Sequence, residues 1–555
     1  MKILPGTFSR FPLALGAGLL LAASFPPFGI AGFAWIAPGL LLAAALGRSG
    51  AEGFRLGYAA GLAHYLTSLH WLLFIPYRWH GIPLGPAFGW LALSAYMALF
   101  PAAWVWLALK MAGAGKPFPN IPNSKFQIPM AVLEQIAAWS WGRRMQWAFA
   151  CAVFWVALEM IVVRLLGGFP WNLLGASQYR LLPLIQIASV IGVHGVAFLV
   201  VWTSVALLGA VAVIVRRPQA RSVWVGEVML PMLAVAGAFA FGSHQLSRPV
   251  VAARSLRVTL VQPSIPQTLI WDSANDQERF RGLLRLSEQA LTNATDLLVW
   301  PEAAIPKMLR YDEEILNGVT GLARAHRVWM IVGSDDAEPD RTSADSQATQ
   351  YFNSAFLISP QGEIMARYCK RNLVIFGEYI PLARWLPFLK WFTPIDGGFT
   401  PGREATRFEL PALNLKLAPL ICYEDTFPQL GRTAAAGDTD LLVNLTNDGW
   451  FGEGAAQWQQ AAGATFRAVE NGLPLVRCAN TGVTCWIDAN GAIRDVFMDP
   501  SGGVYGAGFK TVEIPLAESR APTFYQRHGD WSGWGCVTLT AMALARNWFT
   551  RRKPI

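Results

Sequence analysis

One cysteine stands at the end of an apolar run and is followed at once by acidic residues. The run extends from Leu413 to Ile421, and the octapeptide LICYEDTF then carries Cys422, Tyr423, Glu424 and Asp425. Residues that follow a strand of an α/β sheet lie at the edge where ligands usually bind. This position makes Cys422 a candidate nucleophile, and a buried cysteine that serves only as a small apolar side chain is the alternative.

A nucleophilic thiol needs a base for its proton and a positive group for the oxyanion. Histidine is the common base, but of the seven histidines only His326 lies well within the region around Cys422, and no GxSxG motif is present. Two other stretches contain better candidates for the base and the positive group. Glu302 ends an apolar run in LLVWPEAAIP, and Lys370 and Glu378 lie together in YCKRNLVIFGEYIP. A carboxylate, an ammonium group and a thiol thus each stand near a predicted strand end, although such charged residues are mostly found on surfaces.

The region from about residue 244 to 529 alternates short apolar runs with amphipathic ones. The predicted strands are Leu256–Val261, Asp296–Trp300, Val328–Gly333, Phe356–Ile358, Leu415–Ile421 and Leu441–Leu445. The predicted helices are Gln277–Asn293, Glu313–Ala325 and Gln457–Asn471. This alternation is typical of an α/β fold.

The remaining cysteines predict no metal site, because no CxxC motif or His/Cys cluster has the spacing of metal ligands. Cys478 and Cys485 flank ANTGVT, a candidate hairpin. They are candidates for a disulfide, which the spacing alone does not establish.

The composition of the chain outside this region is typical of a membrane protein. Of the 555 residues 53% are hydrophobic and 15% are charged, against about 25% charged in ordinary soluble domains. A spanning helix needs about 20 mostly apolar residues. About eight stretches are candidates by this rule: Phe11–Pro26, Ile30–Leu46, Leu56–Ile75, Pro86–Ala112, Trp147–Leu166, Ile187–Val215, Val228–Gly242 and Trp531–Trp548.

Basic residues predict the orientation of these spans. The first span has no clear cleavage site and reads as a retained helix. If every stretch crosses the membrane, most basic loop residues, including those at both ends of the chain, fall on one side. The positive-inside rule makes that side cytoplasmic and places the α/β region outside the cytoplasm. The net charge of +9 then reflects membrane topology, and we expect no nucleic-acid partner.

The motifs WPE, Y-x-K-R-x-L-V-x-F-G-E-Y-I-P and I-C-Y-E, in this order, resemble the carbon–nitrogen hydrolase (nitrilase) superfamily. With the spans and with SFPPFG, GGFPWNLLGASQ, VQPSIPQTLIWD and NLTNDGWFG, nearly the whole chain resembles the bacterial apolipoprotein N-acyltransferase family. The resemblance implies a membrane bundle of about eight α-helical spans and an extracytoplasmic α/β domain, a nitrilase-like α-β-β-α sandwich. The implied domains are residues 1–246 with about seven spans, the catalytic residues 247–528, and a last span with a basic tail at 529–555.

The resemblance also implies roles for individual residues. Glu302 is the general base, Lys370 stabilises the oxyanion, and Cys422 carries an acyl chain as a thioester. The implied supporting residues are Glu378, Tyr423, Glu424 and Trp271. Gln460 stands where the family often has a histidine, which puts any role for an imidazole there in doubt.

Two expectations concern the surroundings of Cys422. On a strand, neighbouring side chains point to opposite faces, so the acids that follow need not face the sulfur. The segment PLARWLPFLKWF reads either as a buried loop or as a lid on the bilayer surface. In the second case the inserted residues are Trp385, Phe388, Trp391 and Phe392.

The implied activity transfers a fatty acyl chain from a phospholipid to the N-terminal amine of diacylglyceryl-cysteine in apolipoproteins, without a cofactor. The implied location is the bacterial inner membrane, with cytoplasmic termini and a periplasmic catalytic domain. Two alternatives stay open. One is a membrane-tethered amidase or nitrilase that uses water as the acceptor, and the other is a non-catalytic scaffold for lipid binding or transport.

Overall fold

The structure is a computed structural model that describes most of the chain. The described residues are 10–76, 84–113, 130–216, 224–248, 254–270, 272–340, 348–381, 385, 398–517 and 520–551. Trp271, Phe388, Trp391 and Phe392, four of the predicted site residues, lie outside them.

The chain forms two compact units, each made of separate stretches of sequence. The first comprises Met1–His70, Phe88–Ser247 and His528–Ile555, and the second comprises Trp71–Ala87 and Arg248–Arg527.

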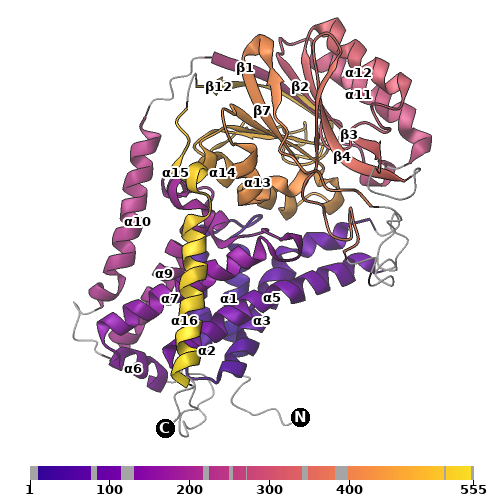
Figure 1. Cartoon of the computed structure of the whole chain (residues 1–555). Helices are drawn as coiled ribbons and strands as arrows, with labels where there is room; N and C mark the ends of the chain where they lie inside the picture. Colours follow the sequence, from indigo (N-terminus) through magenta and orange to yellow (C-terminus); the bar gives the residue numbers. More distant parts are fainter. Residues whose placement is uncertain are drawn as a thin grey trace. The chain divides into compact units, whose positions relative to one another are not determined.

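The first unit is built from helices, shown in indigo to magenta and in yellow in Figure 1. Its longer helices are α1 (Phe11–Ala23), α2 (Ala37–Ala45), α3 (Gly50–Ser68), α5 (Gly85–Ala112), α6 (Met130–Ala138), α7 (Trp141–Val162), α9 (Ala188–Arg216), α10 (Val225–Leu246) and α16 (Trp531–Arg551). Short helical turns join them, namely η1 (Ala31–Trp35), η3 (Leu165–Gly167), η4 (Leu174–Gln178) and α8 (Leu182–Ile185), and η2 (His70–Phe74) leads into the second unit.

Four of the described helices, α5, α7, α9 and α10, are long and apolar enough to cross a membrane. They coincide with four of the predicted stretches, and the prediction of about eight spans is therefore wrong for the described residues. The helix α1 has only 13 residues and α2 only 9. A full crossing needs about 20. The helix α3 is long enough but carries Glu52, Arg55 and His64, and α16 carries Arg546 and Arg551.

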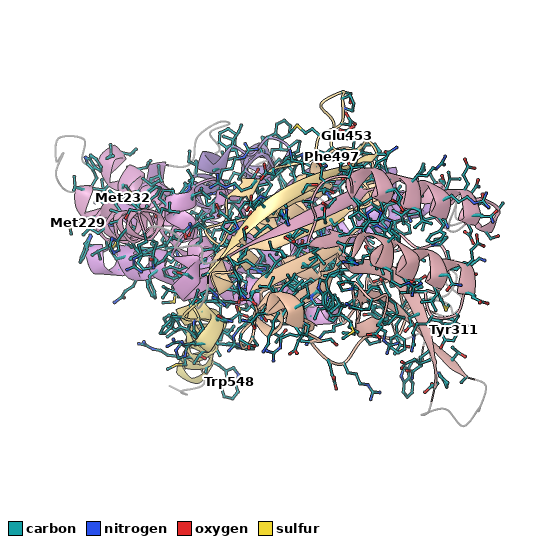
Figure 2. All side chains as sticks on the ribbon, turned by 90° about the horizontal axis from the view of Figure 1, so that it is seen from above. Met229, Met232, Tyr311, Glu453, Phe497 and Trp548 are labelled. Atoms are coloured by element: carbon teal, nitrogen blue, oxygen red, sulfur yellow. The ribbon has the colours of Figure 1, made fainter. Side chains whose placement is uncertain are left out.

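Large apolar side chains lie on the outside of this unit. Met229 and Met232 of α10 and Trp548 of α16 are each about half exposed, and Figure 2 shows them at the outer surface of their helices. Soluble proteins rarely expose such side chains in groups. Their presence on helices of this unit agrees with a protein that contacts lipid.

The second unit contains two sheets of six strands each. The first has the order β12-β1-β2-β3-β4-β5. Its strands are β1 (Arg254–Gln262), β2 (Leu297–Val299), β3 (Trp329–Pro339), β4 (Thr349–Ile358), β5 (Ile364–Cys369) and β12 (Gly508–Leu516). The second has the order β11-β10-β9-β8-β7-β6. Its strands are β6 (Phe408–Leu410), β7 (Leu415–Ile421), β8 (Leu441–Thr446), β9 (Leu475–Ala479), β10 (Cys485–Ile487) and β11 (Ile493–Arg494).

The two sheets form a sandwich with three apolar cores, one between the sheets and one on the outer face of each sheet. One core contains side chains from both sheets, such as Val299 and Val443. The outer face of the first sheet packs on α11 (Asp276–Ala290) and α12 (Glu313–His326), side by side in Figure 1. The outer face of the second packs on α14 (Ala455–Asn471), with α13 (Pro428–Ala434) beside it. This is the α-β-β-α arrangement that the resemblance implied.

The strands at the centre of each sheet are parallel: β1, β2 and β3 in one and β7, β8 and β9 in the other. Because both faces of such strands are covered, they are largely apolar, as LLV is throughout and LKLAPLI is apart from Lys416. All six predicted strands and all three predicted helices are confirmed. The edge strands β5, β6, β11 and β12 were missed, as were β9 and β10 on either side of the predicted hairpin.

The second unit includes a segment from the N-terminal half of the chain. The indole N–H of Trp71 donates to Gln459 Oε1 at 3.1 Å, and its ring lies 4.4 Å from that of Phe451. The side chain of Trp71 is buried. Trp71 thus packs against α14 and the segment before it.

Cys478 and Cys485 are both free thiols. The candidate hairpin is confirmed, because β9 and β10 pair antiparallel, but its register places Cys485 opposite Arg477. The two sulfurs therefore lie on opposite faces of the sheet. Cys478 is in the core between the sheets and Cys485 is in the core beneath α14. A disulfide between them is excluded because their side chains point apart.

We expect both thiols to stay reduced when the protein is prepared without reductant. Unfolding in the presence of an alkylating agent should label Cys478 and Cys485 separately in peptide mass spectrometry. Because both are fully buried, the folded protein should protect them from the same reagent. A cross-linked peptide that joins the two residues would contradict the register of this hairpin.

Candidate active site

Three polar residues follow strands of the sandwich. Glu302 lies just beyond the end of β2, Lys370 follows β5 directly, and Cys422 follows β7 directly. The first two come from one sheet and the third from the other. The sequence prediction that each stands near a strand end is confirmed.

Lys370 is buried between two carboxylates. Its Nζ donates to Glu302 Oε1 at 3.0 Å and to Glu378 Oε1 at 2.9 Å, and its side chain is only 1% exposed. Burial lowers the pKa of Lys370, but electrostatic interaction with the Cys422 sulfur and with the carboxylates of Glu302 and Glu378 outweighs it, and the pKa lies well above its usual value. The ammonium group therefore stays charged, because these partners offset its loss of hydration.

Asn353 joins the two carboxylates and was not predicted from the sequence. Its Nδ2 donates to Glu302 Oε1 at 2.8 Å and to Glu378 Oε1 at 3.0 Å. These bonds leave Glu302 Oε2 buried and without a hydrogen-bond partner among the described residues. A carboxylate with one oxygen held and the other free is arranged to accept a proton at a defined position.

Cys422 begins a tight turn, η9 (Cys422–Thr426), and has φ of +56°. Side chains other than glycine rarely adopt this left-handed conformation. Two amides hold the turn: Asn444 Nδ2 donates to the Cys422 carbonyl at 2.8 Å and Gln460 Nε2 donates to it at 3.0 Å. Gln460, the residue that departs from the family pattern, therefore supports the backbone of the cysteine.

The thiol of Cys422 is kept neutral at rest. Burial raises its pKa well above the usual value, Glu302 raises it further, and Lys370 lowers it. Because only a thiolate is a strong nucleophile, this thiol needs a base at the moment of reaction.

Both carboxylate oxygens of Glu424 are bound by groups other than the Cys422 thiol, though not for the reason that the sequence suggested. The strand ends at Ile421, and Glu424 belongs to the turn, so the alternation of side chains on a strand does not apply. Its Oε1 accepts from the backbone N–H groups of Arg371 and Asn372 at 2.7 and 3.0 Å. Its Oε2 accepts from Ile421 N and Tyr368 Oη, each at 2.8 Å. Glu424 thus fastens the segment after Lys370 to the turn that carries Cys422.

The other supporting residues are placed as follows. Tyr423 donates to the Leu373 carbonyl at 3.0 Å, and its ring centroid is 5.7 Å from Lys370 Nζ. Glu378 also accepts from Val374 N at 2.8 Å. Trp385, the only described residue of the four predicted for the lid, is 78% exposed. In the part of the chain that the structure describes, no group of three or more His, Cys, Asp or Glu residues is arranged to hold a metal ion.

One more acid belongs to this cluster. Asp335 lies on β3 opposite Asn353 in the antiparallel register with β4. Burial first, and then the charges of Glu378 and Glu302, raise its pKa from 3.8 to about 7. Both Asp335 and Asn353 were missed by the sequence analysis, although Asn353 interrupts an apolar strand. A polar residue inside a buried strand was the available signal.

Parts of the chain are similar to known proteins. Residues 257–499 match the family model for carbon–nitrogen hydrolases, so the second unit contains a domain of this class. An amidase of the nitrilase superfamily from Nesterenkonia AN1 aligns with a TM-score of 0.37 and 18% identity, over 54% of this chain and 100% of that one.

The N-terminal part of the chain matches a more specific family. Residues 17–206 match the model for the apolipoprotein N-acyltransferase N-terminal domain. An apolipoprotein N-acyltransferase of Geobacter metallireducens is 35% identical over 98% of this chain and 96% of its own length. One of Rhizobium rhizogenes is 31% identical over 88% of each chain. The chain belongs to the apolipoprotein N-acyltransferase family.

We predict that Asp335 makes the protein less stable as the pH rises. Its folded pKa lies above the ordinary value, so the stability that it contributes is present below about pH 4 and is lost as the pH approaches about 7. Between about pH 5 and pH 8 the melting temperature of Asp335→Asn should therefore fall less than that of the parent protein. The two decreases should differ by about 2 °C or more.

The variant Glu409→Gln changes an exposed side chain on the edge strand β6 and is the control, which should behave like the parent protein. Part of the loss should persist in Asp335→Asn, because Asp448 also has a pKa of about 7. Identical pH profiles for Asp335→Asn and the parent protein would contradict the raised pKa.

Proposed function

We propose that this chain transfers a fatty acyl group from a phospholipid to the N-terminal amine of diacylglyceryl-cysteine in apolipoproteins, through a thioester on Cys422. The observation that carries the proposal is the position of Lys370 between Glu302 and Glu378, in the same domain as a cysteine held on a strained turn. Family membership over nearly the whole chain supports the acceptor.

In the first step Glu302 takes the proton of the Cys422 thiol through its unbonded Oε2. The thiolate attacks the ester carbonyl of the phospholipid, the C–O bond breaks, and Glu302 returns the proton to the leaving lysophospholipid oxygen. A positioned base of this kind contributes roughly 10²–10⁴ in rate. The products are a lysophospholipid and an acyl thioester.

Lys370 stabilises the charge that develops on the carbonyl oxygen. An ammonium group has three N–H donors, and two of them bond Glu302 and Glu378. The third has no partner among the described residues and is available to the oxyanion. Fixed charge in a buried site needs no reorganisation during the reaction.

In the second step the amine of the acceptor attacks the thioester. Glu302 accepts a proton from the nitrogen, the C–S bond breaks, and the thiolate regains the proton. The product is an amide. Dividing one difficult acyl transfer into two is the usual advantage of a covalent nucleophile. No step requires a cofactor.

The supporting residues have positioning roles in this proposal. Glu378 and Asn353 orient Lys370 and Glu302, Glu424 fixes the turn, and Tyr423 covers the lysine. Trp271 lies outside the described residues, and we assign it to the acyl or lipoprotein entrance from the resemblance alone. Trp385, Phe388, Trp391 and Phe392 would form a lid at the bilayer surface, and the high exposure of Trp385 supports this assignment.

The topology is part of the proposal. Residues 1–246 and 529–555 would form the membrane domain and its last helix, and residues 247–528 the catalytic domain. Basic residues at both ends of the chain favour cytoplasmic termini in the bacterial inner membrane and a catalytic domain in the periplasm.

The thioester can be tested by mass spectrometry of the full-length protein after incubation with phospholipid. We expect an acyl mass on the peptide that contains Cys422. The variants Glu302→Gln and Lys370→Met should form it at least about 100-fold more slowly, and Cys422→Ala should not form it at all. The control Cys536→Ala, in α16, should behave like the parent protein.

Addition of a diacylglyceryl-cysteine peptide should then move the acyl group to the peptide amine. Release of free fatty acid without an acylated peptide would favour the amidase alternative. Undiminished peptide acylation by Cys422→Ala would contradict the mechanism.

A further inference from the structure

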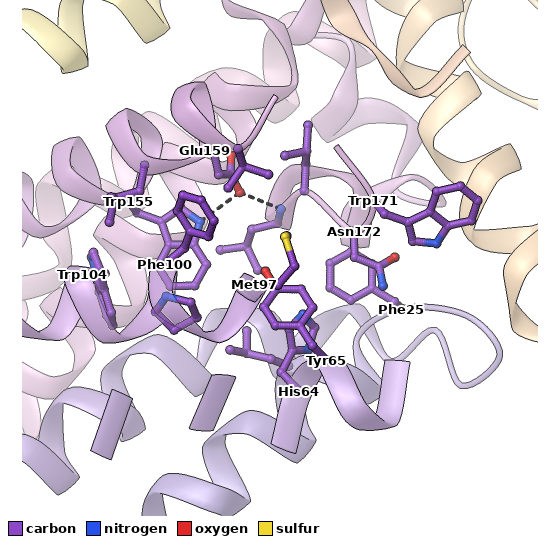
Figure 3. Close-up of a pocket in the computed structure, with 16 residues that line it drawn as sticks. Phe25, His64, Tyr65, Met97, Phe100, Trp104, Trp155, Glu159, Trp171 and Asn172 are labelled. Atoms are coloured by element: carbon purple, nitrogen blue, oxygen red, sulfur yellow. Dashed lines mark hydrogen bonds between the residues drawn. The ribbon is translucent and has the colours of Figure 1, made fainter. Parts of the chain in front are cut away.

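Buried acids of this chain differ in how their oxygens are occupied. In the helical unit, Glu159 Oε1 accepts from Leu174 N at 2.8 Å and from Trp155 Nε1 at 2.9 Å, as the dashed lines in Figure 3 show. Its Oε2 lies 3.2 Å from His194 Nδ1. Both oxygens of Glu159 are therefore already held by neighbours. Asp335, in the second unit, has different surroundings.

Asp335 lies on the face of β3 that is turned toward the other sheet. Residues two apart on a strand share a face, and Ile331 belongs to the core between the sheets, so Gly333 and Asp335 follow it on that side. Gly333 is in contact with the base, because a Cβ at this position would lie 2.9 Å from the Cα of Glu302. Asp335 is thus one strand repeat, about 6.8 Å, from the glycine against which Glu302 packs.

The residue opposite Asp335 offers it no hydrogen-bond donor. Asp335 pairs with Asn353 in the antiparallel register of β3 and β4, and directly opposed side chains have their Cβ atoms about 4.5–5.5 Å apart. A side-chain amide has two N–H groups, and Asn353 uses them on Glu302 and Glu378. Only its oxygen, an acceptor, remains. A protonated Asp335 can donate to that oxygen and an ionised one cannot, so this neighbour favours a bound proton.

Charge balance in the cluster favours a proton at the same place. Glu302 and Glu378 carry two negative charges against the one positive charge of Lys370, so ionised Asp335 adds a second uncompensated negative charge. Like charges close together disfavour ionisation. Burial raises the pKa of Asp335 most, Glu378, Glu302 and Asp336 raise it further, Lys370 lowers it, and the resulting pKa is about 7. Asp335 therefore gains and loses a proton near neutral pH.

The second step of the proposed reaction leaves one proton without an acceptor. A free α-amino group has a pKa of about 7.7–8.0, and the negative charge of the cluster favours the cation, so the acceptor arrives as an ammonium group. Only a nitrogen with a free electron pair attacks a carbonyl carbon. Glu302 takes a proton from the nitrogen after the attack and passes it to the sulfur, so the first proton must go elsewhere.

We propose that Asp335 takes the proton that the acceptor's ammonium group must lose before its nitrogen attacks the thioester on Cys422. This inference rests on the proposed function. An N–H bond of the ammonium group breaks and an O–H bond forms on Asp335. The nitrogen then bonds the carbonyl carbon, and a further proton passes through Glu302 to the sulfur as the C–S bond breaks. Asp335 is partly exposed, whereas Glu302 and Lys370 are buried, so Asp335 can release its proton to water.

The test follows the second step alone in the full-length protein. The thioester is formed first with phospholipid, and its transfer to a diacylglyceryl-cysteine peptide is then timed between about pH 6 and pH 9. At about pH 6 Asp335→Asn should transfer about 5- to 10-fold more slowly than the parent protein, which is the ratio expected between a base of pKa about 7 and a free amine of pKa about 7.7–8.0. At about pH 9 the amine is already neutral, and the two rates should agree within about twofold.

Two controls show whether the ammonium proton is the cause. Hydroxylamine is uncharged at neutral pH and has no such proton to lose, so it should cleave the thioesters of Asp335→Asn and of the parent protein at the same rate. The variant Glu338→Gln changes a carboxylate on the same strand but on the opposite face, where it pairs with Arg367 at 2.7 Å. It should transfer like the parent protein at every pH.

Equal pH profiles for Asp335→Asn and the parent protein, with transfer intact, would overturn the inference and leave the proposed function standing. Slower cleavage of the variant by hydroxylamine would also overturn it, because Asp335 would then only support the structure of the site. If Asp335→Asn does not fold, the parent profile decides. Transfer that falls below about pH 7 supports the inference, and transfer that already falls below about pH 8, with the amine itself, overturns it. Absence of any thioester in the parent protein would refute the proposed function and this inference with it.

Discussion

The site is organised around one buried positive charge. Lys370 lies at the end of an edge strand, is 1% exposed, and has two carboxylate partners. Taking an ammonium group out of water costs several kcal/mol, and close partners with good geometry must offset it. Glu302 and Glu378 supply this compensation, and Asn353 holds them both. Because the cluster is buried, its members depend on one another, and loss of any one leaves an uncompensated group.

The sandwich also carries the cysteine. Glu302 and Lys370 follow strands of one sheet and Cys422 follows a strand of the other, and the two sheets share one core. A second layer of polar contacts fixes the turn of Cys422. The side-chain amide of Gln460 donates to the Cys422 carbonyl and to one carboxylate oxygen of Asp425. The other oxygen of Asp425 pairs with the fully buried Arg477. The strained φ of Cys422 persists because these contacts over-determine it.

The sequence predicts the central strands well, because buried parallel strands are largely apolar. It also predicts where these strands end, because Glu302, Lys370 and Cys422 stand just after apolar runs. It does not predict Asn353, whose partners lie 51 and 25 residues away along the chain. It also overcounts the spans, since composition does not show where a helix such as α1 stops. The sequence also could not decide whether Cys478 and Cys485 form a disulfide. The register of the two strands, and not the spacing of the cysteines, decides on which face of the sheet each sulfur lies.

The most direct test of the buried charge is a double-mutant cycle on the unfolding free energy of the full-length protein, with Glu302→Gln, Lys370→Met and the double variant. Each single change should cost about 2–5 kcal/mol, because it leaves a buried partner uncompensated. The double variant should cost less than the sum by at least about 1 kcal/mol. Losses that add within about 0.5 kcal/mol would contradict the claim that the lysine and the glutamate stabilise each other.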